Sequence, residues 1–231
     1  SKVYQSQSNI TVKSQHFNET DRTQRVAGLI ALNHGKVKNC EFTGEIHSTQ
    51  SEEEYESGIK QKNKEQSYKQ RINYNVFGGV VGKNAGSVIN CINTGLLEID
   101  GINIGGIAGK CSSEITECTN KGSIQGKRNV GGIVGSKTQS SLTKSSTQNN
   151  VSGEENVGGL IGCIEGESTV QVANCYVTES IKGDLLIGTI ENQSLDHNIS
   201  NLYWNSALEE ESVYGQEYTG SNQSIKTILQ V

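Results

Sequence analysis

The chain has 231 residues, with 27 glycines and neither proline nor methionine; 32% of its residues are hydrophobic and 5% are aromatic. So few large apolar side chains exclude a thick globular core, and a formal net charge of −5 argues against binding of nucleic acid through a basic face. No run approaches the roughly 18 to 20 apolar residues that cross a bilayer, so we expect no membrane insertion by this segment.

Residues 1–24 are polar, and Ile10, Val12 and Phe17 are their candidate strand residues. We expect this stretch to form a partial first coil that caps the N-terminal edge of the repeats after it. An uncovered end of a repeat array would expose unpaired backbone.

A short piece with paired glycines recurs between residue 25 and about residue 200. It reads Val-Phe-Gly-Gly-Val-Val-Gly in its second copy, and the copies occupy 26–31, 76–82, 103–109, 129–135 and 156–162. The apolar residues that open the last four copies are 27, 26 and 27 residues apart, and the first gap is 51. A fixed period of this length predicts a repeat architecture.

Each repeat holds two further apolar pieces. The second piece ends in a slot filled by Cys40, Cys91, Cys118, Ser145 and Cys175. The third piece follows six residues later and is marked by Ile46, Leu97, Ile124, Val151 and Ile181. Spacers rich in Asn, Gly and Ser separate the pieces, as is typical of turns. The pattern predicts an all-β fold: a right-handed parallel β-helix, or solenoid, with three short strands per coil of about 26–27 residues.

The paired glycines are interpreted as structural. Val157 and Leu160 cannot both point inward by strict alternation, so the Gly-Gly between them forms a bulge or corner. Glycine would serve there either through its backbone freedom or by allowing close approach to the next coil. A phosphate-binding loop would open a helix, and five copies without a helix argue against it. The glycines concerned are Gly78, Gly79, Gly105, Gly106, Gly131, Gly132, Gly158 and Gly159.

The doubled first gap contains residues 48–75, a segment of different character. Its acidic residues come first and its basic residues later, and it holds Tyr55, Tyr68 and Tyr74 but no Gly-Gly piece. We interpret it as an insertion that projects as a hairpin or loop, with a degenerate coil as the alternative. Since insertions in repeat proteins often form the binding face, the three tyrosines are candidate binding residues; a merely solvated loop is the competing interpretation.

The six cysteines are interpreted as thiols. Four of them share one slot with Ser145, so we expect structural thiols that stack without a covalent partner: Cys40, Cys91, Cys118 and Cys175. Cys111 and Cys163 lie outside this slot, two coils apart.

The sequence has no Cys-x-x-Cys, His-Glu-x-x-His or Gly-x-Ser-x-Gly motif. Its acidic residues fall at unrelated coil positions, for example Asp100, Glu114, Glu117 and Asp184. We therefore predict no catalytic residue, no metal site and no cofactor.

Residues 201–231 are predicted to close the array, after a degenerate glycine piece at 183–188. Tyr203 and Trp204 are expected to cover its end, and sugar binding by these two aromatic residues is the alternative. Residues 224–231 are predicted to begin a short capping helix.

The Gly-Gly-hydrophobic-hydrophobic-Gly core, followed by Asn-Cys and a Gly-hydrophobic-x-Gly strand, resembles the GLUG motif of bacterial surface proteins. The resemblance covers residues 25–215, and the aromatic stretch at 201–205 is similar to the end of such arrays. GLUG repeats are typical of large adhesins and of the non-catalytic region of immunoglobulin A-specific metallopeptidases. The first copy departs from the motif, with Ala27-Gly28 in place of paired glycines, as an end coil would.

The resemblance implies a secreted or cell-surface module without enzymatic activity, a rigid stalk or adhesive region. The sequence has neither an initiator Met nor a signal peptide, and we expect a mature piece of a larger protein. Its expected partners are a protein or glycan on a cell surface or in extracellular matrix, and other domains of the same parent chain, but not nucleic acid. The alternatives are an accessory scaffold of a secreted zinc metallopeptidase and a polysaccharide-acting β-helix enzyme.

Overall fold

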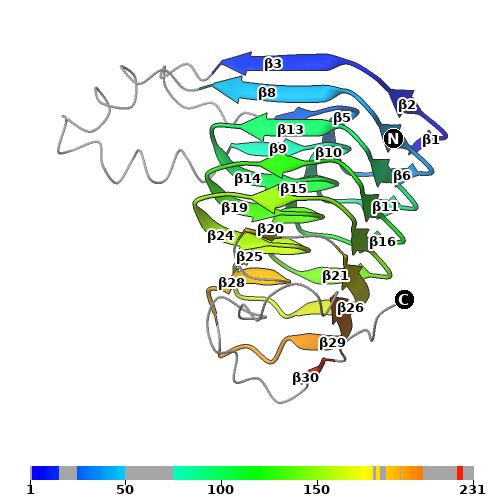
Figure 1. The fold of residues 1–231 in the computed structure, drawn as a ribbon. Helices are drawn as coiled ribbons and strands as arrows, with labels where there is room; N and C mark the ends of the chain where they lie inside the picture. The colour runs from blue at the N-terminus through cyan, green and yellow to red at the C-terminus, as the bar shows by residue number, and fades with distance from the viewer. Residues whose placement is uncertain are drawn as a thin grey trace, which may run out of the picture.

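The structure, a computed structural model, describes residues 2–15, 25–49, 75–178, 181–182, 186–192, 194–204 and 223–225. In these ranges the chain consists of short β-strands joined by tight turns, and they contain no helix. No membrane-spanning helix is therefore found in the described part of the chain. The strands stack roughly in chain order from β3 (Thr11–Gln15) to β29 (Asn198–Trp204) (Figure 1). The prediction of an all-β chain is confirmed.

Four sheets, named A to D, run along the stack. Sheet C contains β4 (Arg25–Ala27), β9 (Val76–Gly78), β14 (Ile102–Gly105), β19 (Arg128–Gly131) and β24 (Glu155–Gly158). Sheet D contains β5 (Ile30–Asn33), β10 (Val81–Asn84), β15 (Ala108–Cys111), β20 (Val134–Lys137), β25 (Ile161–Ile164) and β28 (Ile187–Ile190). Sheet B contains β3, β8 (Glu45–Thr49), β13 (Leu96–Ile99), β18 (Ile124–Gln125), β23 (Val151–Ser152) and β27 (Ile181–Lys182).

Sheet A has 13 strands in two columns. One column contains β1 (Lys2–Tyr4), β6 (Lys36–Lys38), β11 (Ser87–Ile89), β16 (Ile115–Thr116) and β21 (Ser140–Thr143). The other contains β2 (Gln7–Ser8), β7 (Glu41–Phe42), β12 (Ile92–Asn93), β17 (Thr119–Asn120) and β22 (Ser146–Thr147). The longer β26 (Val170–Val177) pairs with both columns, and β29 and β30 (Gln223–Ile225) follow it.

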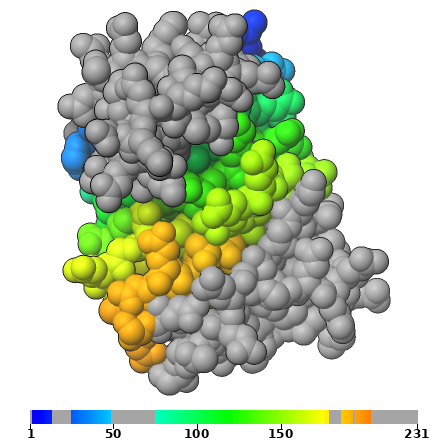
Figure 2. Space-filling model, turned by 90° about the vertical axis from the view of Figure 1, so that its left-hand side faces the viewer, coloured from blue at the N-terminus to red at the C-terminus, as the bar shows by residue number. Residues whose placement is uncertain are grey.

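Every strand of an inner repeat pairs in parallel with the strand at the same place in the next repeat. Sheet C aligns the residues that open the glycine pieces: Val26, Phe77, Ile104, Val130 and Val157. Sheet B aligns the residues that mark the third pieces: Ile46, Leu97, Ile124, Val151 and Ile181. The equivalences inferred from the sequence are thus confirmed. Parallel sheets of short strands with this register are compatible with a β-helix (Figures 1 and 2).

The repeats that begin at β4, β9, β14 and β19 each contain five short strands, where three were predicted; residues 76–99, for example, form β9 to β13. The repeat that begins at β24 has four, because β26 is continuous through both columns of sheet A. The glycine piece is divided into β9 and β10 by the turn at Gly79, and the cysteine piece into β11 and β12 by Asn90, whose left-handed φ of 49° turns the chain. The predicted strand count is wrong because the glycine corner was not counted as the end of a strand and the corner in the cysteine piece was not recognised.

Close packing explains the paired glycines, and none of them has a positive φ. A Cβ on Gly131 would collide with the carbonyl oxygen of Val134. A Cβ on Gly132 would collide with the carbonyl oxygen of Gly159 in the next repeat and with Thr147 Oγ1. Of the two reasons considered for glycine, close approach therefore applies, and left-handed backbone does not.

An asparagine precedes three of the glycine pieces and has φ near 55°: Asn103, Asn129 and Asn156. Their side chains form a ladder, since Asn156 Nδ2 donates to Asn129 Oδ1 at 2.8 Å and Asn129 Nδ2 to Asn103 Oδ1 at 2.9 Å. Asparagine tolerates left-handed backbone better than most residues, and its amide both donates and accepts. The sequence analysis did not explain these recurring asparagines.

The cysteine slot has its own hydrogen-bond pattern. In each repeat the slot side chain donates to the carbonyl oxygen two residues earlier, at 3.2–3.3 Å for Cys40, Cys91, Cys118 and Cys175 and at 2.9 Å for Ser145. The intervening residue has positive φ in every case: Asn39, Asn90, Glu117, Lys144 and Asn174. All six cysteines of the chain are buried thiols in the structure. The slot thus holds a short side chain with a donor, which explains why serine replaces cysteine once.

Apolar side chains of all four sheets fill the interior, but one inward column of sheet D is polar: Asn33, Asn84, Cys111 and Lys137. Lys137 is fully buried. Its ammonium donates to the carbonyl oxygens of Ser113 at 2.9 Å and Gln139 at 2.8 Å, and to Cys111 Sγ at 3.6 Å. Three acceptors match its three donors, although burial still lowers the pKa of Lys137.

The two ends of the stack differ. At the C-terminal end, β30 pairs with β29, so Ser224 and Ile225 lie in a strand and the helix predicted to begin there is wrong. Residues 226–231 lie outside the described residues.

At the N-terminal end, β1 to β3 pair with β6 to β8. The large hydrophobic side chains that are exposed in the described chain all lie at this end: Tyr4, Ile10 and Leu32.

Candidate binding groove

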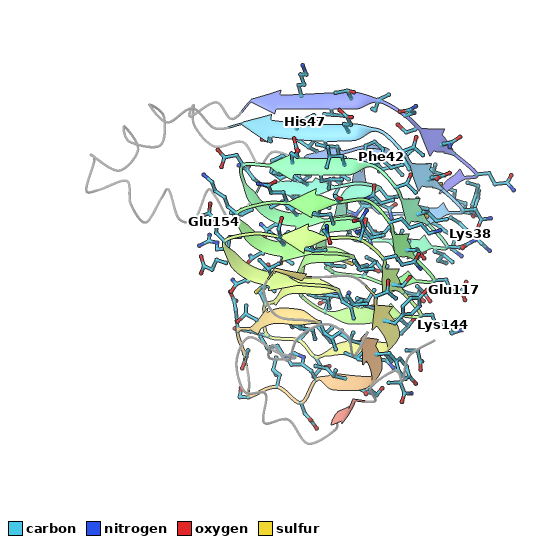
Figure 3. All side chains as sticks on the ribbon, viewed as in Figure 1. Lys38, Phe42, His47, Glu117, Lys144 and Glu154 are labelled. Carbon is cyan, nitrogen blue, oxygen red and sulfur yellow. The ribbon has the colours of Figure 1, made fainter. Side chains whose placement is uncertain are left out.

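A groove of about 500 Å³ lies where the repeats turn from sheet B towards sheet C. It is lined by residues at the end of β8, β13 and β18 and in the turns that follow: His47, Ser48, Glu98, Ile99, Asp100, Gln125, Gly126, Lys127 and Glu154. Figure 3 labels two of them, His47 and Glu154. Because the strands are in register, Glu98 stands opposite both His47 and Gln125. Residues far apart in sequence thus become neighbours on this surface.

Charged side chains of the groove contact one another. The His47 ring lies between two carboxylates, with Nε2 3.0 Å from Glu45 Oε2 and Nδ1 3.0 Å from Glu98 Oε2. Asp100 forms an ion pair with Lys127. These side chains are between 29% and 53% exposed. Ion pairs this exposed contribute little to stability, so their main consequence is to orient polar groups that a ligand can reach.

The groove therefore presents carboxylates, an imidazole, an ammonium and an amide within a short span. Ile99 adds a buried apolar floor residue. Such a set of donors and acceptors suits a ligand rich in hydroxyl or charged groups, such as a glycan or a polar peptide.

The predicted insertion begins at the edge of this groove. Ser48 lines the groove, and its carbonyl oxygen accepts a hydrogen bond from Asp100 N at 2.9 Å. Strand β8 runs on to Thr49, so the first two residues assigned to the insertion belong to the sheet. Tyr55, Tyr68 and Tyr74 lie outside the described residues, and their role as binding residues stays a prediction.

The C-terminal aromatic pair lies elsewhere. Tyr203 and Trp204 are on β29 in sheet A, opposite Tyr176 and Val177. Tyr203 is half-buried and does not line the groove. The structure thus does not bring Tyr203 together with the polar groups described above.

The sequence analysis missed the groove, although a signal for it exists. Asp100 was compared only with other acidic residues, but Asp100, Lys127 and Glu154 follow one another at intervals of 27 residues, the period of the repeat itself. Applying the period to charged residues as well as to apolar ones would have placed these three side chains in one column.

In comparisons with known proteins, no family model, no curated protein and no solved structure matches this chain.

Proposed function

We propose that the chain is a right-handed parallel β-helix that acts as a non-catalytic module of a larger secreted or cell-surface protein, and that its groove is a recognition site. The finer fold assignment is supported by the parallel register of all four sheets, one repeat apart, and by the strong preference of parallel crossovers for the right hand. The resemblance to GLUG repeats supports the extracellular setting.

The observation that carries this function is the position of the groove. The inward columns of the stack hold mainly apolar residues, and the paired glycines and the asparagine ladder join one coil to the next. The groove instead gathers exposed groups from successive coils, and it lies where the chain leaves β8 for residues 50–74. A rigid stack with a polar groove on its surface is the arrangement expected of a stalk with a recognition surface.

The proposed ligand is a polar one, a glycan or protein of a cell surface or extracellular matrix. The same rigid stack could serve as the accessory scaffold of a secreted zinc metallopeptidase. A catalytic domain in the parent chain would identify this role. The carboxylates of Glu98, Asp100 and Glu154 in one groove also favour a polysaccharide as the ligand. The alternative function is an enzyme that cleaves a polysaccharide by hydrolysis or elimination.

Binding to a glycan array and to immobilised matrix proteins tests the proposal. We expect the double variant Glu98→Gln/Glu154→Gln to lose at least about tenfold in affinity for any ligand found, about 1.4 kcal/mol. The matched control is Glu114→Gln/Glu117→Gln, which makes the same charge change at exposed positions away from the groove. Equal binding by wild type and groove variant would place recognition elsewhere. Shortened or unsaturated sugar products would instead identify an enzyme.

A further inference from the structure

A second polar cluster lies on the outer face of sheet D, away from the groove. Cys163 of β25 lies in the same column as Ser136 and Lys110, whose side chain is partly exposed, so this column is on the outer side of sheet D, while Ile164 joins the core. Glu165 follows on the outward side, two residues after Cys163. In the next coil, Thr189 stands opposite Cys163, and Glu191 follows in the place equivalent to Glu165.

Backbone hydrogen bonds hold the two glutamates in neighbouring coils. Glu165 N donates to Lys137 O at 2.9 Å, and Glu191 N donates to Ile164 O at 2.9 Å. Both residues therefore continue the register of their strands beyond the strand ends. As a result the two carboxylates and the thiol converge: one Sγ and two carboxylate oxygens lie within 4.8 Å of one another.

The Cys163 thiol is fully buried although it faces outward, and the Glu165 side chain is only 19% exposed. Glu165 accepts a hydrogen bond from Ser136 Oγ at 2.5 Å and forms an ion pair with Lys110. These contacts fix one carboxylate beside the thiol, while Glu191 remains exposed at the mouth of the cluster. On one side of the site the protein holds the thiol and one carboxylate in place, and the other side is open to solvent.

The cluster concentrates negative charge. Glu165 and Glu191 place two carboxylates beside the Cys163 thiol. Lys110 supplies one positive charge. With the thiol ionised, the cluster would carry three negative charges and one positive charge, so a divalent cation would neutralise it.

We propose that Cys163, Glu165 and Glu191 form a binding site for Zn²⁺ that joins the coil of β25 to the coil of β28. Zinc accepts thiolate and carboxylate ligands, and ligand atoms around a tetrahedral zinc ion lie roughly 3.5 Å apart, so small side-chain rotations bring these three donors into place. A thiolate ligand favours zinc over magnesium or calcium, which prefer oxygen alone. The thiol proton is released to solvent as the ion binds.

This site was not predicted from the sequence, because its ligands do not form a local motif. Cys163 and Glu165 are two residues apart, and Glu191 enters from the next coil. The predicted absence of a metal site rested on the lack of Cys-x-x-Cys and His-Glu-x-x-His, which detect ligands only when they are close in sequence.

Zinc and cobalt titrations of the full chain, after treatment with a chelator, test the proposal. We expect one equivalent of Zn²⁺ to bind with release of a proton near pH 7 and to raise the melting temperature. Co²⁺ should give a thiolate-to-cobalt absorption band in the near ultraviolet. Cys163→Ser should abolish the band, and Glu191→Gln should weaken Zn²⁺ binding at least about tenfold.

Glu167→Gln is the matched control, because Glu167 is an exposed glutamate on the same turn and takes no part in the cluster. It should bind both ions as the wild type does. Glu191→Gln alters an exposed side chain and should fold normally, so it remains informative if Cys163→Ser does not fold. The proposal is overturned if the wild type binds no zinc, or if the cobalt band persists in folded Cys163→Ser, since another cysteine would then be the ligand. An unchanged zinc affinity of Glu191→Gln would also overturn it.

Discussion

The residue in each cysteine slot has two requirements, a short side chain and a hydrogen-bond donor. The slot side chain reaches back across a left-handed residue to the carbonyl oxygen two positions earlier. That carbonyl oxygen also accepts a backbone N–H from the preceding coil, as Ile89 O does from Asn39 N, so the slot side chain adds a second hydrogen bond that an apolar residue of the same size would not make. Ser145 meets both requirements with a hydroxyl that does not ionise in this pH range. Serine is therefore the substitution with which the effect of thiol ionisation can be measured.

Cys175→Ser should reduce the loss of stability at alkaline pH. Burial raises the pKa of Cys175 from 9.0 to about 12. The folded thiol therefore stays protonated where the unfolded one ionises, so its contribution is complete below pH 9 and is lost as pH rises towards 12. Between about pH 8 and about pH 11, we expect the free energy of unfolding to fall by up to about 2.7 kcal/mol more in the wild type than in the variant.

Urea unfolding of both proteins at the two pH values measures this difference. The other titrating groups are shared by the two proteins and cancel in the comparison. An identical pH dependence would mean that the Cys175 thiol ionises as readily in the folded chain as in the unfolded one.

Asn129→Ala should destabilise the fold more than Asn129→Gly. Both variants lose the hydrogen bonds to Asn103 and Asn156, but only alanine also places a Cβ at the left-handed position, where φ is 54°. We expect a loss of about 2–4 kcal/mol for alanine and about 1 kcal/mol less for glycine, measured by urea unfolding. The reverse order would show that the left-handed backbone at this position does not limit which residue can occupy it.

At the scale of elements, the glycine pieces join sheets C and D by a turn that packs against the next coil. The second glycine of a pair lies under the carbonyl oxygen of its counterpart, as Gly132 does under Gly159, and beside a buried polar side chain such as Thr147. Repetition follows from this geometry, since every coil makes the same turn and meets the same neighbour. The glycines are thus explained by the stacking of strands and require no ligand.

Gly132→Ala should be strongly destabilising, with a loss of about 2–4 kcal/mol, because the added Cβ meets backbone that cannot move without separating two coils. Gly153→Ala is the matched control. Its Cβ would meet methyl groups of Val130 and Val157 most closely, which can shift, and would stay 3.3 Å from the carbonyl oxygen of Gly126. Thermal and urea unfolding should rank the two variants in this order. An unchanged melting temperature for Gly132→Ala would show that close packing does not explain the paired glycines.

At the scale of the whole molecule, the proposed β-helix is a one-dimensional stack. Each coil is paired with the coils before and after it, so stability is approximately the sum of the coils and the interfaces between them. A segment that leaves the stack and returns to the next coil can therefore change with little effect on the remainder. The groove and the segment beside it can vary while the stack is maintained.

Replacing residues 51–74 with a short Gly-Ser linker should leave the fold nearly intact. Strands β8 and β9 keep their own sequences in this variant, and the entropic cost of closing a loop changes only slowly with its length. We expect an unchanged β-type circular dichroism spectrum and a loss of binding to any glycan or protein ligand found for the wild type. Unfolding of the variant would show that the segment is a hidden coil. Normal folding with undiminished binding would show that the groove recognises its ligand without the segment.

The period of the sequence by itself determined the strand register. Each coil pairs with its own copy, so residues such as Phe77, Ile104 and Val130 had to align once the repeats were aligned. It also determined which residues form the core, because equivalent positions keep the same side of the coil. The glycine and cysteine columns were visible for the same reason.

The tertiary structure alone decided where the chain turns and which polar groups meet. The left-handed corners at residues such as Asn90 divide the predicted strands, and pairing with β29 draws Ser224 and Ile225 into a strand. The groove and the cluster around Cys163 depend on side-chain direction at positions one coil apart. Those directions follow from corner geometry, which arises when neighbouring coils pack against one another and is not encoded in the spacing of residues along the chain.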